Sequence, residues 1–132
     1  MPLPVVFEHN GLGVLVTPTG EMNMVRFCQQ TEDFYSAQVL EKLRYRIVDL
    51  REVENVEIDL ESIQTLAETD KAAAQICSGL KIAIVVNPGV MEAIAQIYQR
   101  HAKHENLKTQ VFNSLPAARA WVADCADLEA SA

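Results

Sequence analysis

A group of acidic side chains occupies one short stretch of the sequence and comprises Asp49, Glu52, Glu54, Glu57 and Asp59. Carboxylates at this density are typical of general acid–base catalysis or of a divalent-cation site. The whole chain is acidic, however, with a formal net charge of −7 at pH 7 over 132 residues. We therefore interpret this group as the solvated surface of a loop, since acidic side chains keep small proteins in solution.

Two histidines, His101 and His104, are spaced so that they would share one face of a helix beside Glu105. Such a pair can hold a metal ion when a third ligand is available. The sequence offers no identifiable third ligand, and the helix dipole alone favours histidine near a helix C-terminus. We expect neither a metal nor a cofactor.

The three cysteines are far apart in the sequence, at Cys28, Cys77 and Cys125, and form no CxxC motif. Their spacing argues against a disulfide framework or a zinc site. Cys77 lies on the apolar stripe of a predicted helix, which favours a buried hydrophobic role. The sequence also contains no GxSxG, P-loop or GxGxxG motif. We expect a protein that is not an enzyme.

The stretch from Ile47 to Asn87 predicts the architecture. An apolar strand at 47–50, a helix over about 59–77 that Asp59 caps, and an apolar strand at 79–87 form a βαβ unit. Strands this apolar are typical of a parallel sheet that is covered on both faces. The fold class is therefore α/β.

The rest of the chain extends this unit into one mixed sheet of about five strands with about four helices. Asn10-Gly11 predicts an N-terminal β-hairpin. Arg44 and Arg46, at alternate positions, indicate an exposed entry to an otherwise buried strand. Residues 32–42 are ambiguous between helix and loop, and residues 51–58 are predicted to form a loop. We expect residues 1–126 to form one domain, followed by a frayed tail over 127–132. The predicted elements are strands 3–8 and 12–17, helix 22–31, strand 43–50, helix 59–77, strand 79–87, helix 88–101, strand 107–112 and a final helix from 115.

The carboxyl ends of the parallel strands give the first candidate site, because open α/β sheets bind ligands there. The helices that start near Asp59 and Pro88 would add free backbone donors. Polar residues also occur at strand ends for turn geometry alone. The candidate ligand- or partner-binding residues at this edge are Asp49, Arg51, Asp59, Asn87 and Asn113.

An apolar groove is the second candidate. The ambiguous segment carries Phe34, Tyr35, Val39 and Leu40, and the third helix carries Tyr98 on its inner stripe. If the segment covers a groove, a lipid-like molecule or a second subunit would fit beneath it. Packing of these side chains into the core is the alternative.

The order of elements and several local strings resemble the SpoIIAA-like proteins, which share their fold with STAS and anti-sigma-factor-antagonist domains. The resemblance covers most of the chain, and its strings occur in the expected order. These strings are Ile47-Val48-Asp49-Leu50-Arg51, Lys81-Ile82-Ala83-Ile84-Val85-Val86, Ala95-Gln96-Ile97-Tyr98, Gln110-Val111-Phe112 and Ala117-Ala118-Arg119-Ala120-Trp121-Val122.

The resemblance implies a small non-enzymatic module that acts through protein contacts or ligand binding. Anti-sigma-factor antagonists carry Asp-Ser-Ser-Gly at the start of the helix after the third strand, where a phosphorylated serine switches partners. Here Asp59 matches, but Leu60 and Glu61 replace the two serines. The phosphoswitch is therefore not expected, and Ser62 stays open either as a displaced acceptor or as a capping residue.

Charge and hydropathy narrow the class of partner. A negative field repels nucleic acid and anionic membranes. The longest strictly apolar run, Ile82–Val86, is far shorter than the ~20 residues of a membrane span, and no secretory signal pattern precedes the first strand. We expect a cytoplasmic regulatory module that acts through protein–protein contacts, including self-association as a homodimer. The alternative is a binder of a small apolar or lipid-like ligand in a groove under residues 32–42.

Overall fold

The computed structural model describes residues 4–123. Residue 3 of the predicted first strand, Cys125 and the predicted tail after 126 lie outside the described residues. The chain forms a five-stranded mixed sheet in the order β1-β2-β4-β6-β7, which confirms the α/β class. Its strands are β1 (Val5–Glu8), β2 (Gly13–Val16), β4 (Tyr45–Asp49), β6 (Leu80–Val85) and β7 (Leu107–Phe112).

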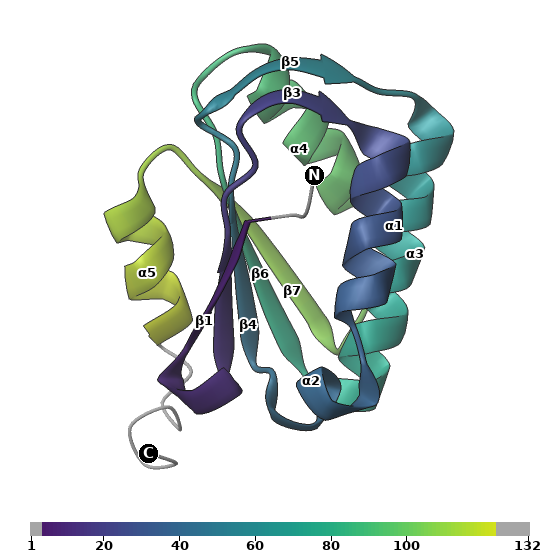
Figure 1. Cartoon of the computed structure of the whole chain (residues 1–132), viewed down its shortest axis with the longest axis vertical. Coiled ribbons are helices and arrows are strands. Elements are labelled where there is room, and N and C mark those ends of the chain that lie inside the picture. The colour runs from purple at the N-terminus through teal and green to yellow at the C-terminus, as the bar shows by residue number, and fades with distance from the viewer. Residues whose placement is uncertain (1–3, 124–132) are drawn as a thin grey trace.

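Helices cover both faces of this sheet (Figure 1). One face carries α1 (Met24–Phe34), α2 (Ala37–Lys42), α3 (Leu60–Cys77) and α4 (Val90–His101), and the other carries α5 (Leu115–Ala123). The main core lies under the first group of helices, and a smaller core lies under α5. All five residues of β4 are buried, as expected for a strand that is covered on both sides.

The parallel part of the sheet runs from β2 through β4 and β6 to β7. The antiparallel pair β1–β2 confirms the predicted hairpin. A short 3₁₀ turn over His9–Gly11 connects its strands, and Asn10 and Gly11 take positive φ angles of 57° and 93°. This left-handed geometry explains why Asn-Gly occurs there.

A second sheet was not predicted. Strands β3 (Gly20–Asn23) and β5 (Val53–Glu57) pair in parallel and run together from the main sheet toward the starts of α1 and α3 (Figure 1). The predicted helix start at Met22 and the predicted loop over 51–58 are therefore wrong. Asn23 ends β3 and caps α1 by accepting a hydrogen bond from the Arg26 amide at 3.0 Å, so the helix begins at Met24.

Residues 32–42 contain the last residues of α1 and the whole of α2, with a short connection between the two helices. Helix α1 ends at Phe34, and Ser36 caps α2 by accepting a hydrogen bond from the Val39 amide. Asp59 caps α3 as predicted, with a 2.7 Å hydrogen bond from the Ser62 amide. At the end of α3, Ser78 takes the left-handed conformation, with φ 61° and ψ 29°.

Two apolar residues at helix starts are exposed. Leu60 is 55% exposed and Val90 is 74% exposed. Each is the first residue of its helix, where the helix has not yet reached the sheet. Arg46 was predicted to lie at an exposed entry to its strand. This prediction is wrong, because only 3% of Arg46 is exposed.

Candidate functional site

The predicted polar edge is present at the carboxyl end of β4. Arg51 forms a bidentate ion pair with Asp49, with Nε to Oδ1 at 2.9 Å and Nη2 to Oδ2 at 2.8 Å. Burial raises the pKa of Asp49, but the hydrogen bonds from Arg51 outweigh burial and hold this pKa below its usual value. The Asn87 amide donates to the Arg51 carbonyl oxygen at 3.2 Å. These three residues therefore lie together and hydrogen-bond one another.

The other two residues predicted for this edge have separate partners. Asn113 donates to the Val86 carbonyl oxygen at 3.0 Å and to Glu92 Oε2 at 3.1 Å. Asp59 lies at the far end of β5 from the sheet, where it caps α3. Because these polar groups bond within the protein, their contacts explain turn and cap geometry and point to no ligand.

The predicted apolar groove residues divide into two sets. Phe34, Val39 and Leu40 pack against the main core, and Phe34 also stacks on Phe7 with ring centroids 5.5 Å apart. The hollow beside α2 is bordered largely by polar side chains, including Gln38 and Lys42. Tyr35 and Tyr98 instead meet in a buried polar network.

This network, which we call the Arg46–Asp70 tetrad, comprises Arg46, Asp70, Tyr35 and Tyr98. Arg46 contacts Asp70 through two hydrogen bonds, Nη1 to Oδ1 at 2.9 Å and Nη2 to Oδ2 at 3.3 Å. The Tyr35 hydroxyl donates to Oδ1 at 2.8 Å, and the Tyr98 hydroxyl donates to Oδ2. Arg46 also donates to the Tyr35 hydroxyl. The tetrad thus joins β4, α3, α4 and the segment after α1.

The tetrad is electrically balanced. Burial disfavours the charged guanidinium, but the charge of Asp70 outweighs burial and raises the pKa of Arg46 above its usual value. Burial is the main reason that the pKa values of Tyr35 and Tyr98 lie well above normal, so both phenols stay protonated at neutral pH. One cation, one anion and two neutral hydroxyls therefore share the site.

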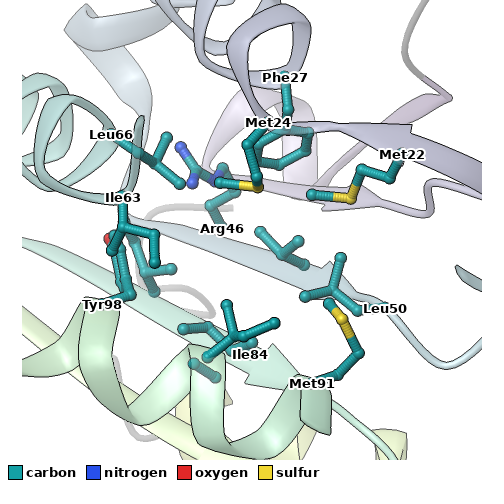
Figure 2. A pocket seen from close by; sticks show the side chains of 14 residues that line it. Met22, Met24, Phe27, Arg46, Leu50, Ile63, Leu66, Ile84, Met91 and Tyr98 are labelled. Atoms are coloured by element: carbon teal, nitrogen blue, oxygen red, sulfur yellow. The ribbon is translucent and has the colours of Figure 1, made fainter. Parts of the chain in front are cut away.

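A cavity of about 50 Å³ lies beside the tetrad, between the sheet and the helices α1, α3 and α4. Its wall is apolar except for Arg46 and Tyr98. In Figure 2 Arg46 lies on one side of the cavity near Leu66, whereas Met22 and Met91 lie on the other. Arg46 and Tyr98 thus form the polar part of an otherwise hydrophobic pocket.

One atom of the tetrad is left without a partner. Among the described residues, Arg46 Nε is the buried side-chain nitrogen or oxygen that has no hydrogen bond. A buried donor left unsatisfied costs about 1–3 kcal/mol, so native proteins rarely keep one without a reason. Nε therefore marks a place where an acceptor is missing.

The sequence carried signals for this tetrad that our prediction missed. Arg46 and Val48 are two apart on β4, so alternation places both on the face that the main core covers. Asp70 lies four residues after Leu66 and four before Ala74, within the inner stripe of α3. A buried charge is costly unless an opposite charge lies beside it, so an arginine on a covered strand and an aspartate on an inner helical stripe are expected to form an ion pair.

The histidines and cysteines considered in the sequence form no metal site among residues 4–123. Between residues 4 and 123, no three His, Cys, Asp or Glu side chains are grouped so as to hold a metal ion. His104 instead bonds to Gln75 and to the Asn106 amide. The Cys28 thiol donates to the Ser62 carbonyl oxygen, and burial raises its pKa to about 11, so it is a poor nucleophile.

The described helices include none with the length and apolar character of a membrane span. The chain matches no known protein-family profile and no curated protein.

Proposed function

We propose that this chain is a non-enzymatic cytosolic binding module, and that the cavity beside the Arg46–Asp70 tetrad takes a small, largely apolar molecule. The observation that carries this proposal is the cavity itself, an apolar pocket with a polar group at one place on its wall. Ligand pockets commonly combine a hydrophobic lining with a few placed polar groups. The resemblance to SpoIIAA-like proteins supports the same class of function.

The cavity is small in the unliganded chain, and its wall has the means to adapt. At about 50 Å³ it is smaller than the ~150 Å³ cavity that accepts benzene. Three methionines line it, Met22, Met24 and Met91, and methionine is the most adaptable apolar side chain. Met22 belongs to the two-stranded β3–β5 sheet, which is separate from the five-stranded main sheet.

A matched pair of substitutions on α4 tests the proposal. Ala95 is buried and lines the cavity, whereas Ala93 is exposed on the same helix. We expect methylenecyclopentane, a compact apolar probe, to shift the methionine methyl resonances of the wild type and of Ala93→Leu. Ala95→Leu should fill the space and abolish the shifts. Equal shifts in both variants, or none in the wild type, would contradict the proposal.

A second candidate function, self-association through protein contacts, is favoured by the open edge of the sheet. Strand β1 pairs only with β2 among the described strands, and its Val6 and Phe7 are 59% and 51% exposed. Exposed apolar residues on an edge strand favour pairing with another strand. Sedimentation equilibrium should then show a wild-type dimer that Val6→Lys converts to a monomer. A monomeric wild type would eliminate this candidate.

The phosphoswitch of anti-sigma-factor antagonists is not part of either proposal. Ser62 is 7% exposed, and its carbonyl oxygen and amide bond to Cys28 and Asp59. A kinase would have to open the start of α3 to reach this side chain.

A further inference from the structure

The tetrad that borders the cavity also restricts the chemistry of its occupant. Resting on the proposed function, we infer that the cavity selects a small uncharged molecule that carries one hydrogen-bond acceptor, such as a ketone, ester or ether oxygen, and that Arg46 Nε donates to it. Three observations lead to this class of ligand, and each concerns a different property of the pocket.

The first observation is the free donor. Arg46 is 3% exposed, and its Nη1 and Nη2 already bond to Asp70 and Tyr35, while Nε has no partner among the described residues. The guanidinium has a fixed planar geometry, so Nε cannot turn toward Asp70 without breaking the paired contacts. Because Arg46 lines the cavity, we assign the missing acceptor to a molecule bound there.

The second observation is the charge balance. Asp70 is fully buried and its carboxylate already neutralises Arg46 at 2.9 Å. A ligand carboxylate would add a second negative charge to a site with no further cation among its lining residues. An uncompensated charge in an apolar interior is strongly disfavoured. A neutral acceptor satisfies Nε without this penalty.

The third observation is the shortage of other polar groups. Besides Arg46, only the Tyr98 hydroxyl among the lining side chains is polar, and it donates to Asp70 Oδ2. Among the lining side chains the Tyr98 oxygen is the one nitrogen or oxygen acceptor, and its hydroxyl is already bound to Asp70. A ligand with several hydroxyl or N–H donors would therefore leave some of them unsatisfied. The cavity therefore suits an apolar body with a single acceptor oxygen.

Three probes of similar size test whether the cavity prefers a neutral acceptor, a hydrocarbon or an anion. Cyclopentanone carries the neutral acceptor, methylenecyclopentane replaces that oxygen with a CH₂ group, and cyclopentanecarboxylate carries a negative charge. Binding is followed in the full chain by the methionine methyl resonances and by the Arg46 Nε–Hε resonance. We expect cyclopentanone to shift both signals, methylenecyclopentane to shift the methyls alone, and the carboxylate to bind most weakly at pH 7.

Arg46→Lys provides the matched variant, because it keeps a positive charge for Asp70 and places a CH₂ group where Nε lies. The affinity ratio of cyclopentanone to methylenecyclopentane should fall roughly fivefold to tenfold in this variant, the worth of one hydrogen bond. If Arg46→Lys does not fold, the Nε–Hε shift in the wild type still decides the question.

The outcomes distinguish the two proposals. If no probe shifts the methionine methyls, the proposed function fails. If the hydrocarbon binds but cyclopentanone leaves Nε–Hε unchanged, or if the carboxylate binds tightest, the cavity is a binding site and this inference is overturned.

Discussion

Arg46 of β4 and Asp70 of α3 form a fully enclosed ion pair, with exposures of 3% and 0% and a distance of 2.9 Å from Nη1 to Oδ1. The pair holds the helix layer against the central strand of the sheet. It also places a charged but balanced group at the wall of the apolar cavity. The stability of the fold and the chemistry of the cavity thus depend on the same two side chains.

Removing one member of this pair should destabilise the protein strongly. Arg46→Met leaves the Asp70 carboxylate buried and uncompensated, and we expect a loss of about 3–5 kcal/mol in the free energy of unfolding. The double variant Arg46→Met/Asp70→Asn removes both charges and should lose much less than the sum of the two single variants. Urea unfolding of the wild type, Arg46→Met, Asp70→Asn and the double variant measures this coupling. Losses in the free energy of unfolding that simply add would contradict it.

A methyl group at Gly13 should clash with Tyr45. The two residues are paired on adjacent strands, and a Cβ built on Gly13 would lie 2.0 Å from the Tyr45 ring at Cζ. We expect Gly13→Ala to lower the free energy of unfolding by about 1–3 kcal/mol or more. In a Tyr45→Ala background the same substitution should cost far less. An equal cost in both backgrounds would show that the ring is not the obstacle.

The ion pair between Glu8 and Arg119 should contribute to the acid dependence of stability. The Arg119 hydrogen bonds are the main reason that the pKa of Glu8 lies below its ordinary value of 4.5. A lowered pKa stabilises the folded state above about pH 4.5, and this contribution disappears as the pH falls through the folded-state value. Because Arg119 is 41% exposed, the effect should be about 0.5–1 kcal/mol.

Glu8→Gln tests this pH dependence. The variant should be less stable than the wild type at pH 7, and the difference should disappear toward pH 3. Chemical unfolding at a series of pH values measures both curves. A difference that grows on acidification would have the wrong sign and would refute the assignment.

The Cys28 thiol should resist alkylation in the native protein. Burial raises its pKa to about 11, and its side chain is 6% exposed. Peptide mapping after iodoacetamide treatment at pH 8 should find Cys28 unmodified in the folded chain and modified after urea unfolding. Rapid modification of Cys28 without denaturant would show that the start of α3 opens readily.

The elements that follow from local sequence were predictable. The Asn10-Gly11 turn, the Asp59 cap and the apolar stretch of β6 each carry their signal within a few residues, and the strand 107–112 matches its predicted bounds. The β3–β5 sheet was not predictable in this way. Its strands are short and pair over a long sequence separation, so neither shows a pattern that differs from a helix start or an acidic loop.

The candidate site was predicted only in part. The polar edge formed where expected between Asp49, Arg51 and Asn87, because parallel strands bring their carboxyl ends together. The tetrad was missed because Arg46 was assigned to an exposed strand entry, although alternation along β4 places it on a covered face. A buried ion pair between distant segments can be predicted from a sequence only when both of its members are placed on inner faces.

The cavity beside the tetrad should take a small uncharged molecule. The most direct measurement is the set of intermolecular NOEs from cyclopentanone to the uniformly labelled wild-type chain. We expect NOEs to the methyl groups of Met22 and Met91 together with a shift of the Arg46 Nε–Hε resonance. NOEs confined to exposed side chains such as Val6 and Phe7, with the methionine methyls unaffected, would contradict it.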